Sequence, residues 1–131
     1  METKKEITME EFNYQQKISM MRILLDIINA DGRIDVRETA LFNKLAEDFE
    51  LEEDSRTDVD AKLSILSLIE IKNFTPEQKK YLATLMGRMI VVDEDVNVNE
   101  VAVYDVVSKF CDIPISFKVE TSDTQTTSSE K

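Results

Sequence analysis

One twelve-residue pattern occurs twice in this chain. The copies read IINADGRIDVRE (27–38) and MIVVDEDVNVNE (89–100). Each copy contains the apolar end of a helix, an acidic turn with one aliphatic residue, and a short polar residue followed by Glu three positions later. A helix–turn–helix pattern repeated at this spacing predicts a helical domain built from two related halves.

The composition supports the same fold class. A chain of 131 residues is expected to form one domain, and 42% apolar residues are enough for a core. Only 2 Gly and 2 Pro leave few sites for tight turns. We therefore predict an all-α fold, a compact single-domain bundle of about five to seven helices with pseudo-symmetric halves near 8–50 and 75–113. The domain is expected over 7–114, between a flexible N-terminus (1–6) and a polar, disordered tail (115–131).

The charge excludes some partners. The net charge is −11, and the 16 basic residues are interspersed with 27 acidic ones, so a phosphate-binding surface is not expected. No apolar run approaches the roughly 20 residues of a membrane span, and no signal-peptide pattern is present. The single cysteine precludes an internal disulfide and fits a cytoplasmic location. The expected partner is a protein, with self-association as an alternative, rather than nucleic acid or membrane.

Capping boxes mark the expected helix starts. In such a box, an N-cap side chain and a Glu or Gln three residues later each satisfy the other's backbone N–H. The pairs that match are Thr8 with Glu11, Asp35 with Glu38, Thr75 with Gln78, Asn97 with Glu100 and, more weakly, Thr57 with Asp60. Together with the apolar spacing they predict helices over about 9–29, 36–49, 58–72, from 76 onward, and 98–111.

Periodicity also predicts which side chains are buried. Ile34 and Val96 occupy equivalent places in the two turns and are expected to lie in the core. The helix over 58–72 is expected to face inward through Val59, Leu63, Leu66 and Ile69. The β-branched segment 101–107 could form a strand, but the box at Asn97 and the spacing of Val103, Val107 and Phe110 favour a helix.

The acidic turns are the candidate functional site. Calcium and similar hard cations bind several oxygen ligands, and both turns gather such oxygens. The second turn begins like an EF-hand loop, but Val98 and Tyr104 stand where that loop needs Gly and Glu. The alternative is that the turns only cap helices. The candidate ligands of a divalent cation are Asp31, Asp35, Glu38, Asp93, Asp95, Asn97 and Glu100.

The residues for catalysis are sparse. Without histidine the chain lacks the usual general base near neutral pH and the imidazole ligand that zinc sites often use. Cys111 falls near the C-terminus of a predicted helix, where the helix dipole disfavours a thiolate. We expect a buried, inert thiol and no enzymatic activity.

The first turn resembles a known family signature. The segment Ala30 to Glu38, placed between an apolar helix and a helix carrying Leu41 and Leu45, is similar to the signature of the TerB-like family, named after a tellurite-resistance protein. The resemblance covers roughly 10–113 and implies a compact, acidic, pseudo-twofold helical domain. It implies acidic-turn positions at Asp31, Asp35, Glu38, Asp93, Asn97 and Glu100, which have been proposed to bind metal in that family. In the second copy Glu94 replaces the glycine and Asn97 the second aspartate.

Overall fold

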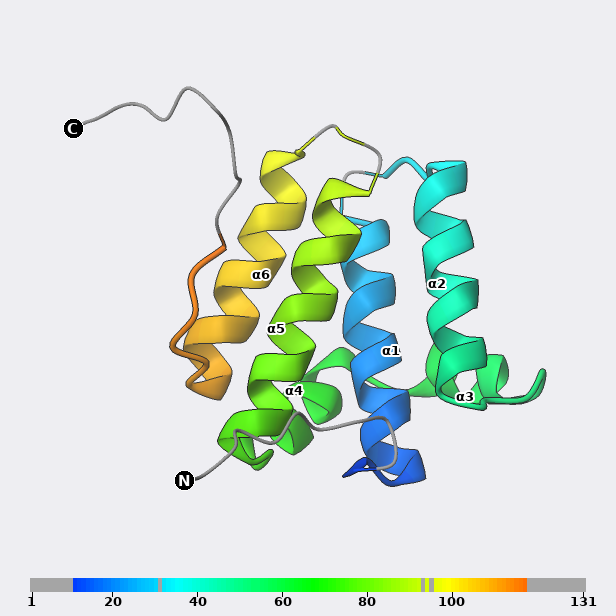
Figure 1. The fold of residues 1–131 in the computed structure, drawn as a ribbon, viewed down its shortest axis with the longest axis horizontal. Helices are drawn as coiled ribbons and strands as arrows, with labels where there is room; N and C mark the ends of the chain where they lie inside the picture. Colours follow the sequence, from blue (N-terminus) through cyan, green and yellow to red (C-terminus); the bar gives the residue numbers. More distant parts are fainter. Residues whose placement is uncertain (1–10, 31, 93, 95, 118–131) are drawn as a thin grey trace, which may run out of the picture.

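The fold is a bundle of helices, as the sequence predicts. The computed structural model describes residues 11–30, 32–92, 94 and 96–117, and this part of the chain forms six helices and no strand (Figure 1). The helices are α1 (Tyr14–Ile28), α2 (Val36–Asp48), α3 (Ser55–Ala61), α4 (Ser64–Lys72), α5 (Pro76–Val91) and α6 (Val98–Cys111). None of them is long and apolar enough to cross a membrane, within the ranges just given.

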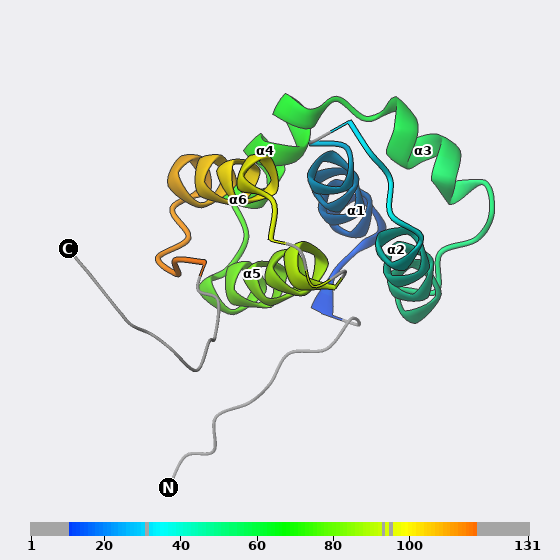
Figure 2. The same ribbon diagram turned by 90° about the horizontal axis from the view of Figure 1, so that it is seen from above.

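Helix α1 is the centre of the bundle. It contacts each of the other five helices, which surround it in Figure 2. Its sequence alternates steps of three and four between apolar residues, so that one broad face and much of its sides are apolar. The fully buried side chains include Met20, Met21, Leu24 and Ile27 of α1 together with Met86 and Met89 of α5. The core therefore lies mainly between the first helices of the two sequence repeats.

Three of the predicted helix starts are confirmed. Asp35 and Thr75 cap α2 and α5 with complete capping boxes, and Pro76 takes the first position of α5, where its missing N–H costs nothing. Asn97 caps α6. The β-branched segment after it is helical, as the cap and spacing predict.

The predicted start of the first helix is wrong. Helix α1 begins at Tyr14 rather than near residue 9, because Asn13 and Gln16 form the box: the Asn13 side chain accepts from the Gln16 N–H at 2.8 Å, and Gln16 Oε1 accepts from the Asn13 N–H at 2.9 Å. Just before this cap, Phe12 is buried, with its ring centroid 5.3 Å from that of Tyr81. Helix α1 thus begins only after the chain has placed Phe12 in the core. Thr8, the cap expected instead, lies outside the described residues.

The helix expected over 58–72 is two helices. Lys62 and Leu63 have extended backbones, with ψ of 132° and 141°, and they separate α3 from α4. Val59 is buried as predicted, but the break changes the helical phase, so α4 turns Ser67 and Ile71 inward. Leu63, Leu66 and Ile69 are therefore exposed, contrary to prediction. Thr57 and Asp60 lie inside α3 and form no capping box at its start.

The chain after α6 folds back onto that helix. The Tyr104 hydroxyl donates to the Ile115 carbonyl at 2.9 Å, and the Phe117 ring packs edge-on against Tyr104 at 5.7 Å. Tyr104, Val107 and Cys111 are the buried apolar residues of α6. Phe110, whose spacing from Val103 and Val107 is that of one helix face, is nevertheless 40% exposed. Ile115 and Phe117, which fall within the disordered tail predicted over 115–131, are partly buried against the core. The rest of that tail and the flexible N-terminus predicted over 1–6 lie outside the described residues.

Candidate functional site

The first turn joins α1 to α2. The Gly32 N–H donates to the Asn29 carbonyl at 3.1 Å, and Gly32 has φ of +77°, a left-handed conformation that glycine adopts without steric cost. Asp35 Oδ1 then accepts from the Arg37 N–H at 2.7 Å, and Glu38 Oε1 accepts from the Asp35 N–H at 3.4 Å. Gly32 therefore shapes the start of the turn after α1, and the Asp35 cap forms its end at the start of α2.

The second turn joins α5 to α6 on the same plan. The Glu94 N–H donates to the Val91 carbonyl at 2.9 Å, and Glu94 has φ of +64°. Asn97 Oδ1 accepts from the N–H groups of Asn99 and Glu100 at 2.8 and 3.3 Å. Replacement of glycine by Glu94 thus leaves the residue in the left-handed region, and the two turns share their local geometry.

The glutamates of the two motifs are buried. Glu38 is 2% exposed and Glu100 is 1% exposed, although each follows its N-cap by only three residues. These buried carboxylates were not expected from the sequence, where capping boxes are usually taken as surface features.

Electrostatics at Asp35 fits a cap. The Arg37 side chain contacts both Asp35 oxygens, at 3.2 and 3.4 Å. This hydrogen bond, reinforced by the one from the Arg37 N–H, lowers the pKa of Asp35 below its ordinary value. Asp35 is therefore a charged cap at neutral pH, whereas Asn97 is a neutral one.

The structure describes four of the seven candidate cation ligands. Asp35, Glu38, Asn97 and Glu100 all lie at helix N-termini, and Asp35 and Asn97 act as caps. Among the described residues no three His, Cys, Asp or Glu side chains are grouped closely enough to hold a metal ion. Asp31, Asp93 and Asp95 lie outside these residues, so cation binding at the turns stays a prediction.

The aliphatic residues of the turns are exposed, which corrects their predicted burial. Ile34 is 67% exposed and Val96 is 39% exposed. Their neighbours across the caps, Val36 and Val98, are 73% and 74% exposed. The backbone of the N-cap does not cause this exposure, because Phe12 and Phe74 directly precede N-caps of the same extended conformation and are buried. Ile34 and Val96 lie instead in connections between helices that do not pack them into the core. Both turns lie at the same end of the bundle (Figure 1), which therefore presents four aliphatic side chains.

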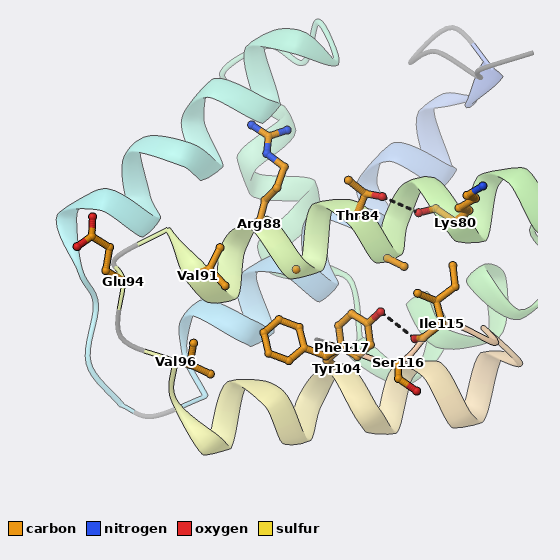
Figure 3. A pocket seen from close by; sticks show the side chains of 12 residues that line it. Lys80, Thr84, Arg88, Val91, Glu94, Val96, Tyr104, Ile115, Ser116 and Phe117 are labelled. Carbon is orange, nitrogen blue, oxygen red and sulfur yellow. Dashed lines mark hydrogen bonds between the residues drawn. The ribbon is translucent and has the colours of Figure 1, made fainter. Parts of the chain in front are cut away.

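A groove runs between α5 and α6. It encloses about 640 Å³ and is lined by Gly87, Val91 and Val96, by Tyr104 from α6, and by the C-terminal segment at Phe117 (Figure 3). Burial raises the pKa of Tyr104, whose hydroxyl already donates to Ile115. The groove is thus a largely apolar surface that the chain's own C-terminal segment partly fills.

A second exposed apolar surface covers α4 and α6. We call it the α4–α6 face. Its side chains are between 40% and 60% exposed. They are Leu63, Ile65, Leu66, Ile69, Val106 and Phe110.

The single thiol is buried. Burial raises the pKa of Cys111 to about 11, and its Sγ lies 3.4 Å from the Leu68 carbonyl, to which it can donate. A thiol in this state is protonated at neutral pH and is a poor nucleophile.

Comparisons with known proteins bear only on the fold. No protein-family model matches the sequence, and no curated protein matches it. The fold is similar to the crystal structure of a protein of unknown function from Porphyromonas gingivalis W83, with a TM-score of 0.68 and 24% sequence identity. The similarity covers 81% of this chain and 90% of that one.

Proposed function

We propose that this protein is a non-enzymatic, TerB-like interaction module that binds a partner protein through the turn end of its bundle, in a stress-response or assembly role in the cytoplasm. One observation carries the proposal. Ile34, Val36, Val96 and Val98 stand exposed beside two turns that each contain one left-handed residue at the equivalent position. Several exposed apolar side chains at one end of a domain are a common feature of binding surfaces.

The charge of the turns defines the partner's chemistry. The chain has a net charge of −11, and the second turn contains Asp93, Glu94 and Asp95 in succession. A partner segment that carries both basic and apolar side chains would complement the acidic turns and the exposed aliphatics together. The buried, protonated state of Cys111 supports a non-enzymatic role.

Affinity capture with matched variants tests the proposal. The full chain is immobilised and exposed to a native lysate at mild salt, beside a Val36→Ser/Val98→Ser variant and a Val106→Ser control on α6. All three sites are exposed, so each variant should fold, as a melting curve can check. A partner should be retained by the wild type and the control and lost from the turn variant. Retention of no protein, or equal retention by the turn variant, would contradict the proposal.

A divalent-cation binding function is the alternative, and one observation favours it. Glu94 keeps the left-handed conformation of Gly32 although it lacks glycine's freedom, so this position of the acidic turn has the same backbone conformation in both halves. Calorimetric titration with calcium, magnesium and manganese would test it. Binding should raise the melting temperature of the wild type, and Asp93→Asn should abolish that gain without destabilising the metal-free protein. Absence of heat and of any melting shift at millimolar cation would refute this alternative.

A further inference from the structure

The α4–α6 face, defined above, is continuous across its two helices. Lys72 of α4 places its Nζ 5.6 Å from the centre of the Phe110 ring, and the Cys111 Sγ lies 3.4 Å from the Leu68 carbonyl. These contacts join the C-terminal halves of α4 and α6. Ile69 precedes Lys72 by three residues, and Val106 precedes Phe110 by four, so each lies one turn back on its own helix. The exposed apolar residues of the two helices therefore adjoin on the outside of the bundle.

This face carries little net charge, unlike the chain as a whole. Lys62 pairs with Glu70 and Lys72 pairs with Asp112, at 3.0 and 2.8 Å. The acidic segment 47–60 belongs to α2, α3 and their connection, away from α6. Two copies of the chain can therefore approach through α4 and α6 with less repulsion than through any acidic surface.

The same face is electrostatically self-complementary. Asp105 and Lys109 are exposed at the edge of this face, where they line a shallow hollow of α6 together with the C-terminal segment 112–116. Neither has an ion-pair partner among the described residues. They are one helical turn apart. Across a twofold axis with antiparallel α6 helices, Asp105 of each copy would face Lys109 of the other.

The size of the face suits a dimer. With six side chains about half exposed, it offers on the order of 600 Å² of apolar surface, the upper end of what an ordinary monomer exposes in one patch. A stable interface buries about 800 Å² on each partner. The apolar residues and their charged rim can together supply one side of such an interface.

We propose that the protein forms a twofold-symmetric homodimer in which the α4–α6 face of one copy packs against the same face of the second copy. This interface is separate from the partner-binding turn end and does not depend on that proposal. The exposed residues of α4 become the centre of the interface, and Asp105 and Lys109 lie at its rim.

Sedimentation equilibrium of the full chain over a range of micromolar concentrations tests the dimer. The wild type should have twice the 15.1 kDa mass of the chain. Ile69→Asp should be monomeric under the same conditions, since it places a charge in the apolar centre. Val98→Asp, at a more exposed site at the turn end, should remain dimeric. Melting curves verify that both variants fold.

A charge-reversal pair tests the geometry. Asp105→Lys alone should weaken dimerisation about tenfold or more by placing like charges together. The double variant Asp105→Lys/Lys109→Asp should restore affinity to within about threefold of the wild type, because the pairs re-form with reversed sign.

Three results would overturn the proposal. The first is a wild-type protein that is monomeric. The second is a dimer that Val98→Asp dissociates and Ile69→Asp does not. The last is a monomer that captures a different protein and no longer captures it when Ile69 is replaced by Asp. The last would assign the α4–α6 face to that partner. Loss of partner capture in the Val36→Ser/Val98→Ser variant with the dimer intact would show that the two surfaces act separately.

Discussion

The two halves of the bundle reach the same turn with different residues. Gly32 and Glu94 both adopt positive φ, and each donates to the carbonyl three residues earlier. Glycine does so without steric cost, whereas a glutamate in the left-handed region costs about 1–2 kcal/mol. In the second half, other contacts must offset that cost.

The packing of the second helix in each half explains the difference. Helix α2 packs on α1 and α5, while α6 packs on α1, α4 and α5 and is covered by the C-terminal segment through Tyr104 and Phe117. Because α6 packs against more helices than α2 does, the turn that precedes α6 can keep its shape without glycine. The motif is thus maintained by its caps and its packing more than by its glycine.

The core residues at equivalent places in the repeat should show the largest effects. Ile28 and Ile90 both lie at the ends of the helices that precede the turns, and both are buried. Ile28→Ala and Ile90→Ala should each lower the free energy of unfolding by about 2–5 kcal/mol. Urea denaturation measures this, with the exposed Ile34→Ala as a control that should change it by less than about 0.5 kcal/mol. A large loss in one half alone would break the equivalence.

Loss of a cap should have an intermediate effect. Asn97→Ala removes the acceptor for two backbone N–H groups of α6 and should cost about 1 kcal/mol in the same assay. Asp35→Ala should change the stability in the same direction. If Asn97→Ala left the unfolding curve unchanged, packing alone would position α6.

The turn residues should respond with opposite signs. At Gly32 an added Cβ meets no atom within 4 Å, so Gly32→Ala should destabilise only through its positive φ. This steric cost of about 1–2 kcal/mol is partly offset by the lower chain entropy of alanine, which leaves a loss of about 1 kcal/mol or less. Glu94→Gly should stabilise by a few tenths of a kcal/mol, because relief of the strained conformation outweighs the added chain entropy. Thermal melts of the two variants would show the signs. A destabilised Glu94→Gly protein would mean that the glutamate side chain supports the turn.

The smallest expected effect is the pH dependence of the stability that Asp35 contributes. The folded-state pKa of Asp35 is lowered, mainly by the Arg37 side chain, so the carboxylate stabilises the fold above its unfolded pKa and loses this contribution as the pH falls through the folded value. The wild type should therefore exceed Asp35→Asn in melting temperature at pH 7, and the difference should vanish in strong acid. Asn97 does not titrate, so the loss of melting temperature caused by Asn97→Ala should not disappear in acid in this way. A pH-independent difference for Asp35→Asn would remove Arg37 from the explanation.

The sequence predicts helix starts better than helix faces. Caps are local, so Asp35, Thr75 and Asn97 could be identified from a few neighbouring residues. The faces depend on phase carried along a helix, and the extended Lys62 and Leu63 reset that phase for α4. No short-range signal marks this break, because neither Gly nor Pro occurs there.

The candidate site was predictable in part for a similar reason. The caps at Asp35 and Asn97 followed from their residue types and spacing. The burial of Glu38 and Glu100 and the exposure of Ile34 and Val96 did not, because they depend on how each turn leaves the bundle. That direction is set by tertiary packing, which the residue pattern does not encode locally.

The burial of Cys111 makes the native chain a ready background for site-directed labelling. Maleimide and methanethiosulfonate reagents react with accessible thiolates, and a shielded thiol with a pKa of about 11 offers them almost none at neutral pH. A Val98→Cys protein would therefore carry one nitroxide or fluorophore per copy without prior removal of the native cysteine. Pulsed electron resonance or energy transfer could then read distances from the turn end in an otherwise unaltered core.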